Sequence, residues 1–270
     1  MGYLHYVTGN PRVKIDFRKY QIEIFDSPGK WMSPSGLEQV RRRIVDITYR
    51  SCGKHPAKGL YVDTSLMKDK IIGICSRNGK DCAFNAMVCI GRYSGREILH
   101  TGPAYCRDEN NGIVSLLFFF ALQYFFLKNR LRTFYLTTIT HVPKVFGLMA
   151  QCIDNVYPNE KQDAVPTREQ IAIRNILADT YIREIEPEYQ VCRTGSFVLK
   201  GFRRQKDGSM VPYPHTAENV PKHRKSAYND RCLHLIDYER GDALIQVGEV
   251  GVKTYLKDGG RNILRTVKKG

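Results

Sequence analysis

The feature that most constrains the fold is an apolar run at residues 113–127, IVSLLFFFALQYFFL, which lies between two strand-like segments. A helix that spans the hydrocarbon core of a bilayer needs about 20 apolar residues. This run is fifteen residues long, contains Gln123 and is followed by Lys128. It therefore predicts a buried helix of a globular domain rather than a membrane segment.

The flanks of this run predict how the helix is connected. Residues 97–106, EILHTGPAYC, alternate apolar and polar side chains and contain a Gly-Pro pair at 102–103. Such a pair is typical of a strand broken by a bulge or bend, with backbone groups left unpaired. Residues 107–111 are polar and end at Gly112, and residues 132–140 return to a strand pattern rich in β-branched and aromatic residues. The segment 97–159 thus predicts strand, turn, helix, strand, loop and short helix.

A helix that starts after a strand and a tight polar turn offers free backbone N–H groups and a positive dipole end to a phosphate. At this point the chain resembles the GNAT superfamily of acyl-coenzyme A N-acyltransferases. The family pattern, Arg/Gln-Gly-x-Gly-x-Gly/Ala before a helix, aligns with NGIVSL at 111–116. Only the first glycine, Gly112, is kept; Asn111 replaces the usual arginine, and Val114 and Leu116 occupy the other two small positions. These two larger side chains are expected to crowd an approaching phosphate.

The resemblance covers residues 69–158 and implies an α/β fold with a mixed, mainly antiparallel central sheet flanked by helices. It places the acyltransferase core, with N-terminal strands and a helix, within residues 1–160. Residues 161–270 are expected to supply a C-terminal helix and strands that pack on the core or complete the same domain.

The activity that the resemblance implies is transfer of an acyl group from a thioester to an amine. The donor is acyl-CoA or an acyl-phosphopantetheine on an acidic carrier protein, and the acceptor is an amine-bearing small molecule or peptide. Backbone amides of the helix start would hold the pyrophosphate, and the bent strand would pair with the pantetheine arm. The implied donor-binding residues are Thr101, Gly102, Ala104, Cys106, Asn111, Gly112, Ile113, Val114, Ser115 and Leu116.

Acyl transfer to an amine needs a proton acceptor for the ammonium and a proton donor for the leaving thiolate. The candidates are His100 in the bent strand, His141 after the second strand, Tyr157 and Glu97. In the family a tyrosine near the position of Tyr157 protonates the coenzyme A sulfur. Glu97 has an alternative role as the partner of a lysine.

The rest of the chain predicts further strands and helices. Strand patterns occur at 12–25, 70–75, 82–89, 190–202, 232–236 and 243–255, with Asn78-Gly79 as a hairpin turn. Residues 36–51 have the period of an amphipathic helix, and Thr167 with Gln170 forms a capping box before a helix at 171–185.

A formal charge of +15 and a pI near 9.5 favour polyanionic partners. This leaves two other functions open. The first is a nucleic-acid-binding protein whose basic stretch at 203–231 follows phosphates while Tyr213 or Tyr228 stacks on bases. The second is a GNAT-like fold without catalysis, which acts as a binding module.

The eight cysteines form no CxxC pair, so buried thiols in a reducing compartment are expected rather than a disulfide framework or a metal site. The first residues, MGYLHYVTGNPRVKIDF, lack the apolar centre of a signal peptide. We therefore expect a cytoplasmic protein.

Overall fold

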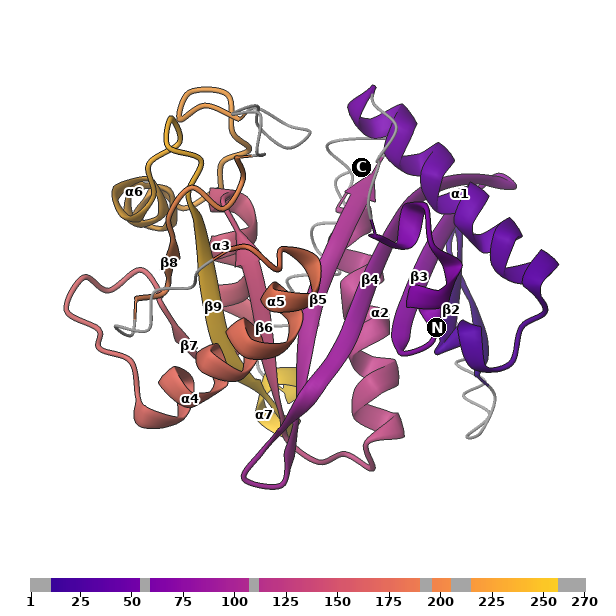
Figure 1. Ribbon diagram of the computed structural model, residues 1–270, viewed down its shortest axis with the longest axis horizontal. Coiled ribbons are helices and arrows are strands. Elements are labelled where there is room, and N and C mark those ends of the chain that lie inside the picture. The colour runs from indigo at the N-terminus through magenta and orange to yellow at the C-terminus, as the bar shows by residue number, and fades with distance from the viewer. Residues whose placement is uncertain (1–10, 54–58, 107–111, 190–195, 205–214, 257–270) are drawn as a thin grey trace. The chain divides into compact units, whose positions relative to one another are not determined.

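The computed structural model describes residues 11–53, 59–106, 112–189, 196–204 and 215–256. The described residues form an α/β fold with nine strands in a mainly antiparallel sheet flanked by helices, as predicted (Figure 1). The hydrogen-bonded order is β1-β2-β3-β4-β5-β6-β9-β7, and β8 pairs with β9. The strands are β1 (Arg12–Phe17), β2 (Tyr20–Asp26), β3 (Lys70–Arg77), β4 (Lys80–Tyr93), β5 (Arg96–Cys106), β6 (Phe134–Thr140), β7 (Asp154–Tyr157), β8 (Val198–Leu199) and β9 (Ala243–Val250). The α-helices are α1 (Pro34–Cys52), α2 (Ile113–Lys128), α3 (Pro143–Cys152), α4 (Arg168–Leu177), α5 (Arg183–Ile185), α6 (Ser226–Leu235) and α7 (Val252–Leu256).

The chain divides into two compact units. The first comprises the described residues within Met1–Cys89 and Thr101–Leu131, and the second comprises those within Ile90–His100 and Arg132–Gly259. Both β4 and β5 contribute residues to each unit. β5 is one uninterrupted strand, so the predicted break at Gly102-Pro103 does not appear as a gap. The boundary between the units nevertheless falls in this strand between His100 and Thr101, next to that pair.

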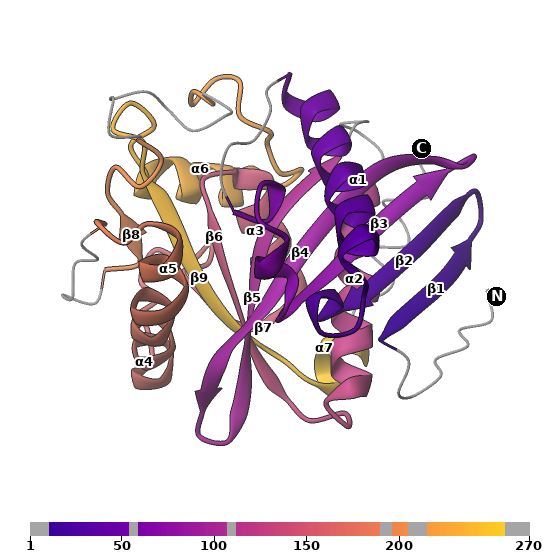
Figure 2. The ribbon, with the colours of Figure 1, turned by 45° about the vertical axis from the view of Figure 1, so that its right-hand side comes forward.

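In the first unit, β1, β2, β3 and the first part of β4 form an antiparallel meander. The predicted Asn78-Gly79 turn joins β3 and β4, and both residues have positive φ, 51° and 72°. Helix α1 covers one sheet face, where Val40, Ile44 and Ile47 pack with Ile72 and other buried residues (Figure 2). The predicted amphipathic helix is therefore confirmed.

Helix α2 covers the opposite face of this meander. Successive residues of a strand point to opposite faces. Ile72 and Ile74 belong to the cluster that includes α1, whereas a Cβ added at Gly73 would lie 3.0 Å from Leu117 of α2. Because β3 is covered on both sides, its sequence is apolar without alternation. Within the described residues, no helix is long and apolar enough to cross a membrane.

In the second unit, β9 pairs antiparallel with both β6 and β7 and with the short β8. Residues after 160 thus complete a sheet with strands that precede 160. Helix α4 begins with the predicted Thr167–Gln170 capping box, in which each side chain bonds the other residue's backbone. After α4 the chain continues as a π-helical turn at Ala178–Ile182 and then as α5.

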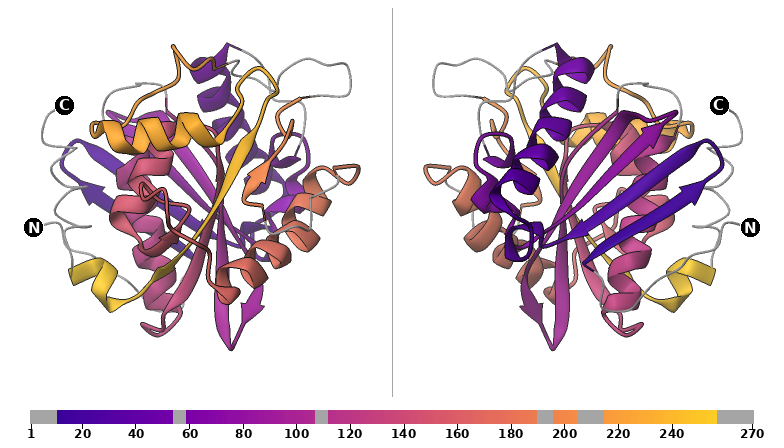
Figure 3. Two further views of the ribbon diagram at one scale, coloured as in Figure 1. Left: turned by 90° about the vertical axis from the view of Figure 1, so that its left-hand side faces the viewer. Right: turned by 90° about the vertical axis from the view of Figure 1, so that its right-hand side faces the viewer.

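Two strand predictions in this unit were wrong. Residues 232–236 lie at the end of α6 and in the residue after it, because Tyr228 and Cys232, one helical turn apart, are both buried against α3 (Figure 3). Of residues 190–202, only Val198–Leu199 is a strand within the described part. The strand predicted at 243–255 ends at Val250, where α7 follows.

Candidate functional site

The start of α2 in the first unit has the features of an anion site. Its N-cap is Gly112, with φ 63° and ψ 9°, which supplies no side-chain cap, and its first turn holds no acidic residue. By contrast, Ser33 caps α1 and Thr167 caps α4 through side-chain oxygens. The first N–H groups of a helix have no partner within the helix, and they carry the positive end of its dipole. The start of α2 therefore offers backbone donors without a built-in acceptor from its N-cap residue.

The side chains of the first turn leave this end of α2 less crowded than the sequence suggested. Ile113 and Leu116 are 1% and 0% exposed. Leu116 therefore packs inside the unit, and the expectation that it crowds a phosphate was wrong. Val114 and Ser115 are partly exposed. Asn111 and the turn at 107–111 lie outside the described residues.

The second half of β5 holds the other predicted donor-binding residues. Thr101 is buried, and Gly102, Ala104 and Cys106 are partly buried. Between the last two, Tyr105 stacks on Phe84 with ring centroids 5.8 Å apart. This half of β5 belongs to the first unit, whereas β6 belongs to the second.

His100 ends the half of β5 that belongs to the second unit. It is 1% exposed, and its Nδ1 lies 2.9 Å from Oγ1 of Thr137 on β6. The ring of Tyr181 packs against it with centroids 4.2 Å apart. His100 is thus a buried, hydrogen-bonded histidine held between β6 and the π-turn.

His141 follows β6 and has a different environment. Burial lowers its pKa to about 3, and the charges of Arg203 and His215 act in the same direction. Its Nε2 atom is buried without a hydrogen-bond partner. Because general bases work best with a pKa near the operating pH, His141 is poorly suited to accept a proton from an ammonium at neutral pH.

Glu97 and Tyr157 occupy two further environments. Glu97 forms an ion pair with Arg92 across the β4–β5 turn, where the Arg92 Nε donates over 2.7 Å. Its alternative role was predicted as the partner of a lysine, whereas the ion pair found here is with an arginine. Tyr157 ends β7, and its ring meets Phe197 edge-on at a centroid distance of 4.7 Å. The four candidate residues thus have four separate sets of neighbours.

Tyr157 also lines a cavity of about 310 Å³ in the second unit. Tyr135, Glu169 and Glu249 line the same cavity. The Tyr135 hydroxyl accepts from Arg96 over 3.2 Å and donates to Glu169 over 3.4 Å, and Arg96 lies 3.6 Å from Glu249. The lining carboxylates of Glu169 and Glu249 are therefore linked to one another through Tyr135 and Arg96, although no sequence motif connects these residues.

Of the two tyrosines in the basic stretch at 203–231 that were expected to stack on bases, only Tyr228 lies among the described residues. Tyr228 is 5% exposed and packs in a core cluster with Phe146 and Cys232. It is therefore not available to stack on a base, and that expectation was wrong. Tyr213 lies outside the described residues.

The predictions of buried thiols and of no metal site are compared here with the described residues only. Cys75, Cys152 and Cys232 are free thiols, and Cys192 lies outside the described residues. Within the described part, no group of three or more His, Cys, Asp or Glu residues is placed to hold a metal ion.

Comparison with known proteins gave matches only among solved structures. No protein-family model and no curated protein matched the sequence. A GNAT-family acetyltransferase from Streptococcus pneumoniae aligns over 85% of this chain and 99% of its own, with 11% identity and a TM-score of 0.37. An aminoglycoside acetyltransferase from an uncultured soil metagenomic sample, in complex with sisomicin, aligns over 41% of this chain and 72% of its own, with 10% identity and a TM-score of 0.33. An aminoglycoside N-acetyltransferase in complex with CoA aligns over 44% and 74%, with 12% identity and a TM-score of 0.29. Scores this low assign neither a family nor an activity.

Sequence reasoning missed the residues that surround His141. Arg203 was placed only in a basic stretch, and Tyr238 was not singled out, yet the Tyr238 hydroxyl donates to the His141 carbonyl oxygen. The guanidinium of Arg203 lies 5.6 Å from the Tyr238 ring centroid. The charge of Arg203 was the only available signal, and it does not distinguish a buried arginine from an exposed one.

Proposed function

We propose that this protein is an N-acyltransferase that moves an acyl group from a thioester to an amine. The observation that carries the proposal is the start of α2: an uncapped helix end, with no acidic residue in its first turn, that follows β5 after a short connection. The β3–β4 hairpin, β5, α2 and β6 follow one another in the order that the resemblance implied.

The donor in this proposal binds to the first unit. Backbone N–H groups at the start of the helix, from Gly112 to Ser115, bind the pyrophosphate of acyl-CoA or the phosphate of acyl-phosphopantetheine, because they carry partial positive charge. The Leu116 N–H, also among the donor-binding residues that the resemblance implied, donates to the Gly112 carbonyl over 2.9 Å instead. The backbone of β5 from Thr101 to Cys106 pairs with the amides of the pantetheine arm. Asn111 is proposed to act at the same turn.

Proton transfer is assigned to the second unit. We assign the proton acceptor to His100, whose Nδ1 is fixed by Thr137, and the proton donor for the thiolate to Tyr157. His141 and Glu97 take secondary roles, because His141 has a pKa of about 3 and Glu97 is paired with Arg92. The acceptor is an amine-bearing small molecule or peptide.

The first test is thermal unfolding of the full chain with coenzyme A. At about 100 times its dissociation constant, the ligand adds about 2.7 kcal/mol of stability. Ser115→Glu places a carboxylate in the first turn of α2, where it competes with the pyrophosphate, and should remove the coenzyme A effect. Ser35→Glu makes the same change in the first turn of α1 and should leave the effect intact.

A second test measures transfer itself. His100→Gln and Tyr157→Phe should each lower kcat while the thermal shift with coenzyme A stays nearly unchanged. In this proposal the pyrophosphate and the pantetheine arm are bound by backbone groups of α2 and β5, not by these two side chains. If neither coenzyme A nor an acyl-loaded carrier protein shifts the unfolding of the unchanged protein, the transferase proposal fails. Binding of an oligonucleotide instead would favour the nucleic-acid alternative.

A further inference from the structure

Arg203, directly after the turn that follows β8, is a buried cation without a hydrogen-bond partner. Arg203 is only 5% exposed, and its Nε and both terminal nitrogens are buried without a hydrogen-bond partner. Leaving a charged group buried and unpaired costs several kcal/mol. The ring of Tyr238, 5.6 Å away, offers a cation–π contact but no hydrogen-bond acceptor for the three nitrogens. The guanidinium therefore lacks a hydrogen-bonding anion among the described residues.

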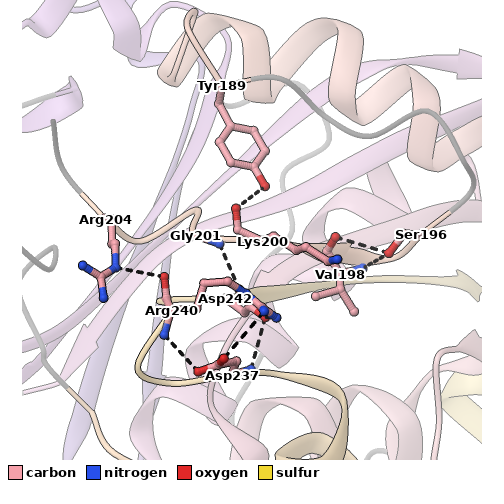
Figure 4. Close-up of polar contacts among 9 residues, drawn as sticks. All are labelled: Tyr189, Ser196, Val198, Lys200, Gly201, Arg204, Asp237, Arg240 and Asp242. Carbon is pink, nitrogen blue, oxygen red and sulfur yellow. Dashed lines mark hydrogen bonds and ion pairs between the residues drawn. The ribbon is translucent and has the colours of Figure 1, made fainter. Parts of the chain in front are cut away.

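The nearest carboxylate does not supply that anion. Asp242 is fully buried, and Arg240 donates to its Oδ1 over 2.7 Å through Nε and to its Oδ2 through a terminal nitrogen. The backbone N–H groups of Gly201 and Asp237 donate to the same carboxylate over 2.9 and 3.2 Å. Figure 4 shows these contacts converging on Asp242. Four donors occupy both oxygens, so Asp242 attracts the charge of Arg203 through space but accepts no hydrogen bond from it.

The same loop fixes the backbone of Arg203. Its N–H donates to the Gly241 carbonyl over 2.9 Å. On its C-terminal side, the Arg204 side chain donates to the carbonyl oxygen of Arg240 (Figure 4). It also donates to the carbonyl oxygen of Glu239. The Arg203 N–H and the Arg204 side chain thus both bond residues 239–241, so the position of the Arg203 backbone does not depend on its guanidinium.

His141 faces the same unpaired charge. Its Nε2 has no partner, and its pKa of about 3 keeps the ring neutral at physiological pH. The Tyr238 hydroxyl bonds its carbonyl oxygen, which fixes His141 beside Arg203. A neutral imidazole in the Nε2–H form is a hydrogen-bond donor. His141 and His215, whose rings lie 5.4 Å apart, are both partly exposed, so this group of side chains reaches the surface on their side.

We propose that Arg203 and His141 form a binding site for the carboxylate of a small organic acid. The guanidinium fork matches the two oxygens of a carboxylate, and His141 Nε2–H adds a third donor. One cation beside a neutral imidazole balances a single negative charge, which favours a carboxylate over a doubly charged phosphate. The site lies in the second unit and does not depend on the proposed acyl transfer.

The test is thermal unfolding of the full chain in sodium acetate, with sodium chloride at equal ionic strength as the reference and inorganic phosphate as a second probe. At about ten times its dissociation constant, acetate should raise Tm by about 3 °C over chloride. Phosphate at the same ionic strength should give a smaller rise. Arg203→Met should abolish the acetate-specific rise, because Met fills the space without donors.

Arg204→Met is the matched control, because it removes the same charge from the neighbouring exposed residue. It also removes the Arg204 bonds to residues 239 and 240, but the Arg203 N–H still donates to the Gly241 carbonyl, so the variant should keep the acetate response. If Arg203→Met does not fold, Arg203→Lys is tested in its place. Lysine keeps the positive charge but lacks the guanidinium fork, so the acetate-specific rise in Tm should be smaller than in the unchanged protein. The proposal is overturned if acetate gives no rise over chloride in the unchanged protein. It is also overturned if the Arg203 variant responds as fully as the Arg204 variant.

Discussion

Replacing Arg43 by methionine should destabilise the first unit by about 3 kcal/mol, near the lower end of what is lost when one partner of a buried ion pair is removed. Arg43 on α1 donates to Asp81 through two nitrogens, over 2.8 and 2.9 Å, and to Glu23 over 2.7 Å. The side chains of Glu23 and Asp81 are only 7% and 20% exposed. We expect a loss near the lower end of that range, because in the variant Arg12 still pairs with Glu23 and Ser76 still donates to Asp81.

The same change should depend on pH with a definite sign. Burial raises the pKa of Glu23, but hydrogen bonds from Arg12 and Arg43 outweigh it and hold the pKa below its usual value. In Asp81, burial is likewise outweighed by Arg43 and Ser76, so its pKa is also lowered. Carboxylates with lowered folded-state pKa values stabilise the fold above their unfolded values, about 4, and lose that contribution as the pH falls through the folded values. Without Arg43, burial favours the protonated forms, so the variant loses less on acidification.

Urea unfolding of both proteins at pH 7 and near pH 4 measures these effects. The difference in the free energy of unfolding should be largest at pH 7 and smaller near pH 4. Arg42→Met is the control, because that side chain is 75% exposed and solvent screens its pair with Glu38, so the variant should lose little stability. A loss below about 1 kcal/mol at pH 7 for the Arg43 variant, or an equal loss at both pH values, would refute the reasoning.

Two further predictions concern packing and capping in the second unit. A Cβ at Gly147 of α3 would lie 2.6 Å from His223 Cγ, so Gly147→Ala should lower the free energy of unfolding in urea by about 1–3 kcal/mol. Gly36→Ala is the control: its Cβ would meet only the flexible side chains of Met32 and Ser33, so the free energy of unfolding should change little. No loss in the Gly147 variant would show that α3 and α6 pack less tightly than described. Thr167→Ala removes the hydroxyl that accepts from Gln170 N–H and should cost about 1 kcal/mol; an unchanged urea midpoint would mean that the cap does not stabilise α4.

Several elements were predictable because their determinants lie within a few residues of one another. Asn78-Gly79 sets a hairpin turn through two positive φ values, and Thr167 with Gln170 closes a capping box across three residues. The period of Val40, Ile44 and Ile47 alone places one face of α1 in the core. The strand predicted at 232–236 failed because a five-residue apolar run has no distinct period, and contact with α3 decided for a helix.

The candidate site was less predictable, because each side chain depends on partners far along the chain. The sequence indicated His100 and His141 equally, but the fold places His100 against Thr137 and Tyr181, and His141 against Arg203 and Tyr238. The sequence placed Val114 and Leu116 in the first turn of α2, but only burial showed that Leu116 turns into the core.

By itself, the sequence determined the helix start at Gly112, the strands that flank it and the class of fold, because local backbone preferences and apolar periodicity encode them. The tertiary structure alone decided that Asp242 is saturated by Arg240, Gly201 and Asp237 while Arg203 stays unpaired. Charge pairing depends on distances in space, and residues 201 and 242 come together only through the pairing of β8 with β9.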